Sequence, residues 1–354
     1  MTKTAVVLFN LGGPDRPESV RPFLFNLFND PAIIGLPQPF RWLLAQLISR
    51  RRAPIAREIY DNLGGGSPLL PNTEAQAKAL EQALAAEGEG HTAKVFIAMR
   101  YWHPMSGETA RAVHAFGPDR VLLLPLYPQF STTTTGSSTK DWFRAARAVG
   151  LRAPTRVLCC YPQDAGFVAE AAARLAKALD EAAAEGRPFR VLFSAHGLPK
   201  KIVTGGDPYQ WQVEQSTAAV VAALGARAEG LDWLVCYQSR VGPLEWIGPA
   251  TEDEIRRAGA EGVGVVLVPI AFVSEHSETL VELDIEYREL AEEAQVPLYL
   301  RVPTVSDGAS FVAGLAGLVQ RALDGKDEST APAEGRAFCP AEFGRCACRE
   351  ASRA

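Results

Sequence analysis

The chain has 354 residues and a formal net charge of −5, with 47% hydrophobic and 22% charged residues. These values are ordinary for a globular protein and exclude a disordered or collagen-like chain, and the length predicts two domains at about 100–200 residues each. Lysine and arginine are scattered along the chain without the basic stripe that a nucleic-acid backbone needs, which argues against nucleic acid as a partner.

Short runs of branched apolar residues alternate with alanine-rich stretches of helical length along the whole chain. We expect strands over residues 5–9, 94–99, 120–125, 156–160, 189–194, 233–237, 263–269 and 298–301. We expect helices over residues 72–87, 107–116, 164–185, 210–224, 252–259, 278–294 and 310–323. The alternation predicts an α/β fold in which parallel strands are joined by crossover helices.

The two halves of the chain have similar sequences where their predicted strands end, although no strict repeat exists. Residues 7–14 (VLFNLGGP) resemble residues 191–199 (VLFSAHGLP), and residues 121–127 (VLLLPLY) resemble residues 266–272 (VLVPIAF). Two such lobes would place the carboxyl ends of both sheets around one cleft, where open α/β sheets bind ligands. Strand-turn signals shared by any two α/β lobes are the alternative explanation.

We expect three parts in the chain. An N-terminal lobe covers residues 1–152, a C-terminal lobe covers residues 153–330, and a cysteine-bearing tail covers residues 331–354. A polar stretch without periodicity at residues 325–335 would connect the tail to the second lobe.

The start of the chain predicts a cytoplasmic protein, since the first predicted strand leaves no room for a signal peptide. No uncharged apolar run reaches the length of a membrane-spanning helix. Residues 36–52 combine large apolar side chains with the basic run Arg50, Arg51 and Arg52. This segment is either an amphipathic helix that lies on an anionic membrane surface or one that packs on the core.

His196 directly follows a predicted buried strand, where Gly197 and Pro199 turn the chain. The turn would direct the imidazole to the carboxyl end of the sheet, where a base with a pKa near neutral pH is useful. A loop histidine with a satisfied hydrogen bond is the alternative.

His276 and three glutamates follow another predicted strand. Glu278, Glu282 and Glu286 recur every four residues, which would place them on one face of a helix. Like charges at this spacing destabilise a helix unless a cation or a proton is shared among them. The row is therefore either a solvated acidic face or a set of oxygen ligands for weak, transient binding of a divalent cation.

The cysteines of a cytoplasmic chain point to metal or redox chemistry rather than to disulfides. Cys339, Cys346 and Cys348 offer three thiolates within ten residues, one fewer than a four-cysteine site needs. Cys159 or Cys160 would supply the fourth. Chance clustering in the tail is the alternative, and the thiols alone do not decide between zinc and an iron–sulfur cluster.

Several motifs resemble those of the ferrochelatase family and follow the family's order along the chain. The most specific are LFSAHGLP at 192–199, QSRVGPLEWIGP at 238–249 and PIAFVSEHSETLVELDIEY at 269–287, with shorter matches at 9–14, 51–54, 64–68, 100–104 and 127–138. The resemblance implies two Rossmann-like domains around a porphyrin cleft. It also implies an enzyme of haem biosynthesis that inserts Fe²⁺, its substrate, into protoporphyrin IX with release of two protons, and that attaches peripherally to the inner membrane.

The resemblance also implies roles for individual residues. His196 is similar to the family's active-site histidine, which accepts pyrrole protons or delivers metal, and Glu278 is similar to its partner across the macrocycle. His276, Glu282 and Glu286 resemble a polar iron path behind that partner. The residues that resemble those lining or holding the porphyrin are Leu11, Arg52, Tyr60, Tyr101, Trp246 and Phe272.

The tail resembles the extension of ferrochelatases that hold a [2Fe–2S] cluster, although its cysteine spacing departs from the animal pattern. Two other functions stay open: a chelatase for another metal or tetrapyrrole, and a non-catalytic carrier of metal or tetrapyrrole on the same scaffold. The sequence also leaves open a homodimer and the number of propionates on the physiological porphyrin.

Overall fold

The structure is a computed structural model, and it describes residues 2–86, 91–240, 242–324, 330–331 and 338–351. The chain has the expected α/β fold and divides into two compact units. Unit 1 contains Met1–Cys160, Leu315–Phe338 and Cys346–Ala354, and unit 2 contains Tyr161–Gly314 and Cys339–Arg345. These limits differ from the expected 1–152, 153–330 and 331–354, because both ends of the expected second lobe belong to unit 1 and the tail is divided between the units.

The sheet of unit 1 is parallel and has the order β2-β1-β3-β4-β9. Its interior strand β1 is buried on both faces from Thr4 onward, which explains why the sequence there is continuously apolar rather than alternating. The strands are β1 (Thr2–Asn10), β2 (His91–Met99), β3 (Arg120–Pro125), β4 (Thr155–Leu158) and the two-residue β9 (Thr330–Ala331). Most of the expected connector at 325–335 lies outside the described residues.

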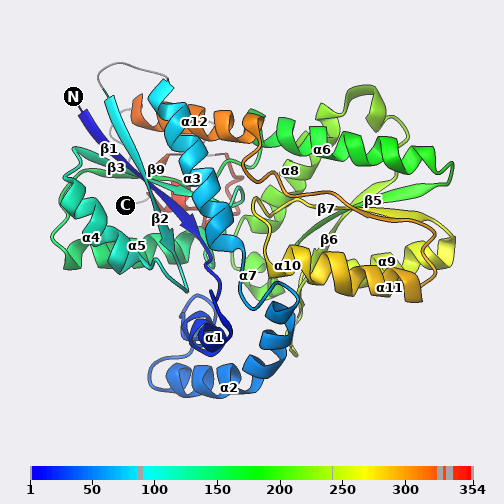
Figure 1. The fold of residues 1–354 in the computed structure, drawn as a ribbon, viewed down its shortest axis with the longest axis horizontal. Helices are drawn as coiled ribbons and strands as arrows, with labels where there is room; N and C mark the ends of the chain where they lie inside the picture. Colours follow the sequence, from blue (N-terminus) through cyan, green and yellow to red (C-terminus); the bar gives the residue numbers. More distant parts are fainter. Residues whose placement is uncertain (1, 87–90, 241, 325–329, 332–337, 352–354) are drawn as a thin grey trace. The chain divides into compact units, whose positions relative to one another are not determined.

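Helices cover the sheet of unit 1, as Figure 1 shows for α4 (Ser106–Phe116) and α5 (Thr135–Ala148). The alternate residues Ala5, Val7 and Phe9 of β1 pack against these two helices, and Trp142 of α5 is fully buried there. Helix α3 (Leu69–Ala86) precedes β2. It matches the helix expected at 72–87, of which residue 87 lies outside the described residues.

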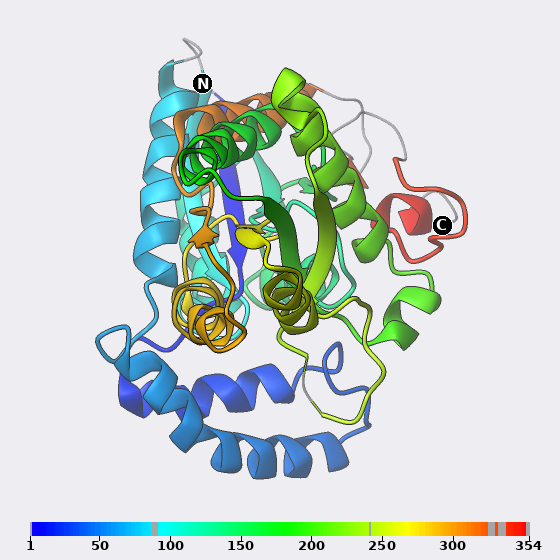
Figure 2. The same ribbon diagram turned by 90° about the vertical axis from the view of Figure 1, so that its right-hand side faces the viewer.

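Two further helices of unit 1 are neighbours, α1 (Val20–Phe28) and α2 (Phe40–Asp61) (Figures 1 and 2). They share a small apolar core that also contains Tyr60 and Tyr101. The short η1 (Pro17–Ser19) precedes them, and α13 (Ala347–Ala351) ends the described chain. Among the described residues, no helix is both long and apolar enough to cross a membrane.

The sheet of unit 2 has the order β6-β5-β7-β8, and all its strands are parallel. Its strands are β5 (Phe189–His196), β6 (Trp233–Gln238), β7 (Gly264–Pro269) and β8 (Tyr299–Arg301). The carboxyl ends of parallel strands meet at one edge of a sheet, so the residues that follow β5, β6 and β7 are neighbours in space.

Helices α6 (Ala165–Ala184) and α8 (Tyr209–Ala223) pack together on one face of this sheet, and α9 (Thr251–Glu261) and α11 (Tyr287–Glu293) cover the other (Figure 1). The short elements are α7 (Lys200–Thr204) and η2 (Gly225–Ala228). Helix α12 (Ala309–Asp324) begins in unit 2 and continues in unit 1.

The segment expected as a single helix at 278–294 is interrupted. It consists of α10 (Ser277–Leu280), the π-helical turn η3 (Glu282–Glu286) and α11. In η3 the amide of Glu286 donates to the carbonyl of Val281, five residues back, at 2.9 Å. This wider turn changes the direction of the side chains that follow it, so the expected row of three glutamates on one helical face is not formed.

Candidate active site

His196 and Glu278 form a hydrogen-bonded pair at the carboxyl end of the unit 2 sheet. His196 is the last residue of β5, and Glu278 lies in the first turn of α10, the helix that follows the neighbouring strand β7. Nδ1 of His196 lies 2.9 Å from Oε2 of Glu278, and the side chains are 39% and 27% exposed. The two expected residues therefore meet as a half-buried pair within unit 2.

Neighbouring charges shift the pKa of both members of the pair. Burial opposes protonation of His196, but the carboxylates of Glu278 and Glu282 outweigh that cost and raise its pKa. Burial alone would raise the pKa of Glu278, but the two histidines nearby lower it to about 2. The carboxylate thus stays ionised and favours a proton on the imidazole.

The structure corrects one expectation about this pair. We expected His196 and Glu278 to stand on opposite sides of a flat macrocycle, yet a 2.9 Å hydrogen bond leaves no room for a ring between them. Because β5 and β7 are adjacent parallel strands, the residues that follow them reach the same point from the same edge. The pair can act on one face of a ring, as a unit.

His276 supports the pair from one side. Its ring is buried, and Nε2 lies 4.0 Å from Oε2 of Glu278. Nδ1 lies 3.2 Å from the carbonyl oxygen of Ser274, and the ring packs against Phe272 with centroids 4.9 Å apart. Burial lowers the pKa of His276, so this imidazole is the neutral member of the group.

Glu282 lies behind the pair and accepts four hydrogen bonds, all from uncharged donors. They come from Nε2 of Gln238 at 3.0 Å, the amide and hydroxyl of Ser239 at 2.9 and 2.6 Å, and the hydroxyl of Tyr287 at 3.1 Å. Burial and the charge of Glu278 raise the pKa of Glu282 to about 7. This carboxyl can therefore take up or release a proton near neutral pH.

The donors to Glu282 were not among the site residues predicted from the sequence. Gln238 and Ser239 stand at the start of the quoted motif at 238–249, and the positive φ of 60° at Ser239 turns its amide and hydroxyl to Glu282. The polar pair directly after a buried strand was the signal. Glu286, in contrast, is exposed, because the π-helical turn separates it from Glu282.

The six residues expected to contact the porphyrin lie in both units. In unit 1, Leu11 packs on the small core of α1 and α2, which contains Tyr60 and Tyr101, and Arg52 is exposed on α2. In unit 2, Phe272 packs on His276, and Trp246 lies beside the backbone of Gly197, next to His196.

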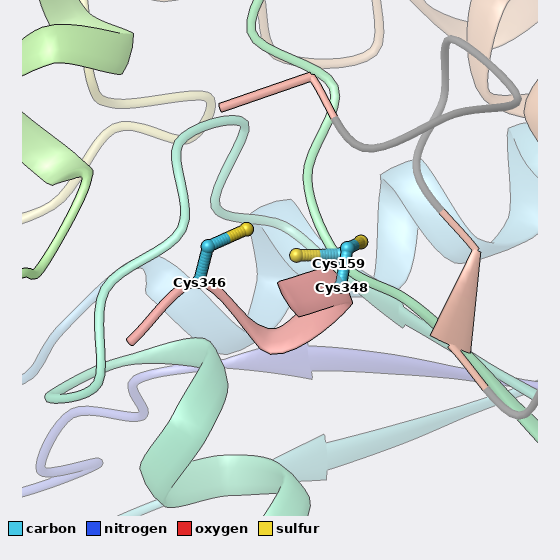
Figure 3. Close-up of side chains that lie close together, drawn as sticks. All are labelled: Cys159, Cys346 and Cys348. Carbon is cyan, nitrogen blue, oxygen red and sulfur yellow. The ribbon is translucent and has the colours of Figure 1, made fainter. Parts of the chain in front are cut away.

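Three cysteines of unit 1 come together, as Figure 3 shows: Cys159, which follows β4, and Cys346 and Cys348 of the tail. All three are buried, and their sulfur atoms lie within 4.8 Å of one another. The neighbouring thiols of Cys160 and Cys346 raise the pKa of Cys159 well above its usual value. Such crowded thiols ionise readily only when a metal supplies the compensating charge.

The other two expected ligands have different surroundings. Cys160 is adjacent to Cys159 and is buried. Cys339 belongs to unit 2, where Nε2 of Gln212 donates to its sulfur at 3.0 Å.

Comparison with known proteins agrees with the motifs. The sequence profile of the ferrochelatase family matches residues 3–323. The ferrochelatase of Phenylobacterium zucineum (strain HLK1) is 58% identical over 352 residues, which cover 99% of this chain and 100% of that one. The ferrochelatase of Caulobacter vibrioides (strain NA1000 / CB15N) is 56% identical, and the match covers 99% of each chain.

Among solved structures, the fold is similar to the sirohydrochlorin chelatase SirB from Bacillus subtilis subspecies spizizenii in complex with cobalt. The TM-score is 0.52 at 11% identity, and the match covers 93% of this chain and 99% of that one. At this identity the similarity concerns the fold alone.

Proposed function

This chain belongs to the ferrochelatase family, and we propose that His196 and Glu278 form the centre at which it metallates its porphyrin. The protein is a lyase that inserts Fe²⁺ into protoporphyrin IX to form protohaem, the last step of haem biosynthesis. The observation that carries the proposal is the 2.9 Å hydrogen bond between the imidazole and the carboxylate at the end of adjacent strands.

The reaction removes two pyrrole protons and opens the ring nitrogens to the metal, so the site needs two proton acceptors. With Nδ1 of His196 donating to Glu278, Nε2 is the nitrogen that accepts the first pyrrole proton. Glu278 stabilises the imidazolium that forms. Glu282, with a pKa of about 7, accepts the second proton. The carboxylates of Glu278 and Glu282 offer oxygen ligands to the incoming iron.

Replacing the imidazole tests this assignment. His196→Ala should lower the rate of protohaem formation by about 10²- to 10⁴-fold, because a positioned base is lost. The rate is measured anaerobically by absorbance with Fe²⁺ and protoporphyrin IX, and porphyrin binding by fluorescence. His114→Ala, on the exposed side of α4, is the control and should keep the wild-type rate. A wild-type rate in His196→Ala would refute the assignment.

The same assay addresses the carrier alternative. An enzyme forms many equivalents of protohaem per protein, whereas a carrier stops at one.

Each unit also offers side chains that we propose as porphyrin contacts: Leu11, Arg52, Tyr60 and Tyr101 in unit 1, and Trp246 and Phe272 in unit 2.

We propose that the cysteines hold a [2Fe–2S] cluster. Three buried sulfur atoms within 4.8 Å fit such a group, which takes four thiolates. The proposed ligands are Cys159, Cys346 and Cys348. When bound, the cluster supplies the positive iron centres that keep these thiols ionised.

Adjacent cysteines allow a matched test of the ligand set. Cys159→Ser should abolish the visible absorbance of the anaerobically purified protein, and Cys160→Ser should retain it. Iron and zinc are determined in parallel, so that a zinc site is recognised. The opposite result for the two variants would reject Cys159 as a ligand.

We also propose that α2 lies on an anionic membrane surface. Phe40, Leu43 and Leu47 recur at the spacing of one helical face and are 63%, 56% and 46% exposed. The exposed residues Arg50, Arg51 and Arg52 follow on the same helix. Apolar side chains next to arginines suit the interface of a bilayer that contains anionic lipids.

Vesicle binding tests the surface. The protein should sediment with vesicles that contain phosphatidylglycerol and not with phosphatidylcholine vesicles. The double variant Leu43→Glu/Leu47→Glu should lose this binding, whereas Leu244→Glu, at a leucine of unit 2 that is also 46% exposed, should keep it. Equal binding of all three proteins would exclude α2 as the contact.

A further inference from the structure

The segment of residues 275–284 carries His276, Glu278 and Glu282, yet it lies between two strands rather than within one. It includes α10 and the start of the π-helical turn η3, both too short to hold their shape alone. The catalytic proposal requires atoms such as Oε2 of Glu278 to stay in place to within a fraction of an ångström. Other residues must therefore fix this segment.

We propose that two side chains of the edge strand β8, Tyr299 and Arg301, are positioning residues that hold the 275–284 segment for catalysis. The inference rests on the proposed function of His196 and Glu278. Alternate residues of a strand point to the same face, so Tyr299 and Arg301 reach the segment together.

Arg301 joins the two ends of the segment. Its Nη1 donates to Oε1 of Glu275 at 2.6 Å, its Nε donates to Oδ1 of Asp284 at 2.8 Å, and its Nη2 pairs with the other oxygen of Asp284. The guanidinium is only 10% exposed, and the amide of Thr304 donates to the same Oε1 of Glu275 at 2.9 Å. A planar group with a fixed fork of donors can hold two carboxylates at a set separation.

Tyr299 holds the segment in its π-helical part. Its hydroxyl donates to the carbonyl oxygen of Leu283 at 2.7 Å. Leu283 lies directly after Glu282 and directly before Asp284, the partner of Arg301. The two side chains of β8 therefore fix adjacent residues of η3, one through the backbone and one through a carboxylate.

The residues that lie between these contacts are the ones that the catalytic proposal uses. His276, Glu278 and Glu282 lie between Glu275 and Asp284 in the chain. None of the hydrogen bonds described above for Tyr299 and Arg301 goes to these three residues. Loss of the Arg301 fork would free both ends of the segment while leaving the expected porphyrin-contacting side chains in place. We therefore expect a loss in turnover rather than in porphyrin binding.

The test is Arg301→Gln in the full-length protein, assayed anaerobically with Fe²⁺ and protoporphyrin IX. We expect kcat to fall about 10-fold or more, because small displacements of reacting groups are costly. KM for the porphyrin should change by less than about 2-fold, since uniform binding is retained. Arg301→Lys should recover part of kcat, because its ammonium group can still reach one carboxylate.

Arg190 provides a matched control within the same sheet. It is also 10% exposed and also joins two carboxylates, Asp232 at 2.8 Å and Glu261 at 3.0 Å. It lies near the amino end of β5, six residues or about 20 Å of strand before His196. Arg190→Gln should destabilise the protein to a similar extent in urea unfolding and leave kcat within about 2-fold.

Equal kcat values for Arg301→Gln and Arg190→Gln would overturn the positioning role. If Arg301→Gln does not fold, Tyr299→Phe decides: a fall in kcat at unchanged porphyrin KM supports the role, and a wild-type kcat overturns it. His196→Ala, assayed in parallel, separates the two hypotheses. Full activity of His196→Ala overturns the proposed function and this inference with it, whereas an inactive His196→Ala beside an unaffected Arg301→Gln overturns the positioning role alone.

Discussion

Two carboxylates, one buried in unit 1 and one half-buried in unit 2, accept the same number of hydrogen bonds but from different donors. Asp30 of unit 1 accepts from Arg100, from the hydroxyls of Tyr101 and Ser137, and from the amide of Ala32. Glu282 of unit 2 also accepts four, and every one of those donors is neutral. The difference between the two sites is one permanent positive charge.

The contrast indicates what each carboxylate does. The Arg100 guanidinium compensates the charge of Asp30, so this group can tie the loop after α1 to β2 and α5 without chemistry. Glu282 lies beside another carboxylate, Glu278, which together with burial raises its pKa to about 7. A carboxylate without a fixed cation beside it can accept a mobile one, which agrees with the proposed role of Glu282 toward iron and the released protons.

The largest effect on stability is expected at Asp30, whose charge the Arg100 guanidinium compensates. Asp30→Asn should lower the free energy of unfolding by about 3 kcal/mol, because it leaves the Arg100 guanidinium partly buried without its partner. Urea unfolding followed by circular dichroism measures the change. Asp141→Asn is the control, since Asp141 lies 3.9 Å from Arg100 and should contribute much less. Equal losses in the two variants would show that Asp30 is not the main partner of Arg100.

The sequence predicted much of the frame in which these sites lie. Each of the eight expected strands overlaps a strand of the structure, because short runs of branched apolar residues can be recognised without knowledge of their partners. The proximity of His196 and Glu278 could also be expected, since each follows a strand of a parallel sheet. Their direct hydrogen bond could not, because it depends on β5 and β7 being neighbours.

What the sequence could not predict is set by tertiary contacts. Helix α5 starts in a run of threonine, glycine and serine, poor helix formers, and is stabilised by burial of Trp142 against the sheet. The π-helical turn η3 has the composition of an ordinary helix, and its contacts to Tyr299 and Arg301 come from a strand further along the chain. The choice between Cys159 and Cys160 is similar, because adjacent residues differ only in the direction of their side chains.

A pH-dependent effect on stability is expected at Glu282, which accepts hydrogen bonds from neutral donors. The pKa of Glu282 is about 7 in the folded protein against an ordinary value of 4.5, so the folded state binds this proton more tightly than the unfolded chain. The free energy of unfolding should therefore fall as the pH rises from about 4.5 to about 7, and this contribution should then stay constant. Glu282→Gln removes the titration, so its stability relative to wild type should rise over this window by about 1–3 kcal/mol.

Urea unfolding at a series of pH values measures this difference. Glu293→Gln, at an exposed glutamate of α11, should change the free energy of unfolding by less than about 0.5 kcal/mol at every pH. A flat difference between Glu282→Gln and wild type would mean that Glu282 has an ordinary pKa, and the proposed second proton acceptor would be lost.

The smallest expected effect compares one hydroxyl at each site. Ser239 donates to Glu282 at 2.6 Å, and Ser137 donates to Asp30. Removal of a hydrogen bond to a neutral group costs about 1 kcal/mol and to a charged group about 2 kcal/mol. Ser239→Ala should therefore cost more at pH 8, where Glu282 is ionised, than at pH 5, where it is protonated. Ser137→Ala should cost the same at both pH values, because Asp30 has the fixed positive charge of Arg100 beside it. A pH-independent loss in both variants would remove the distinction between the two carboxylates.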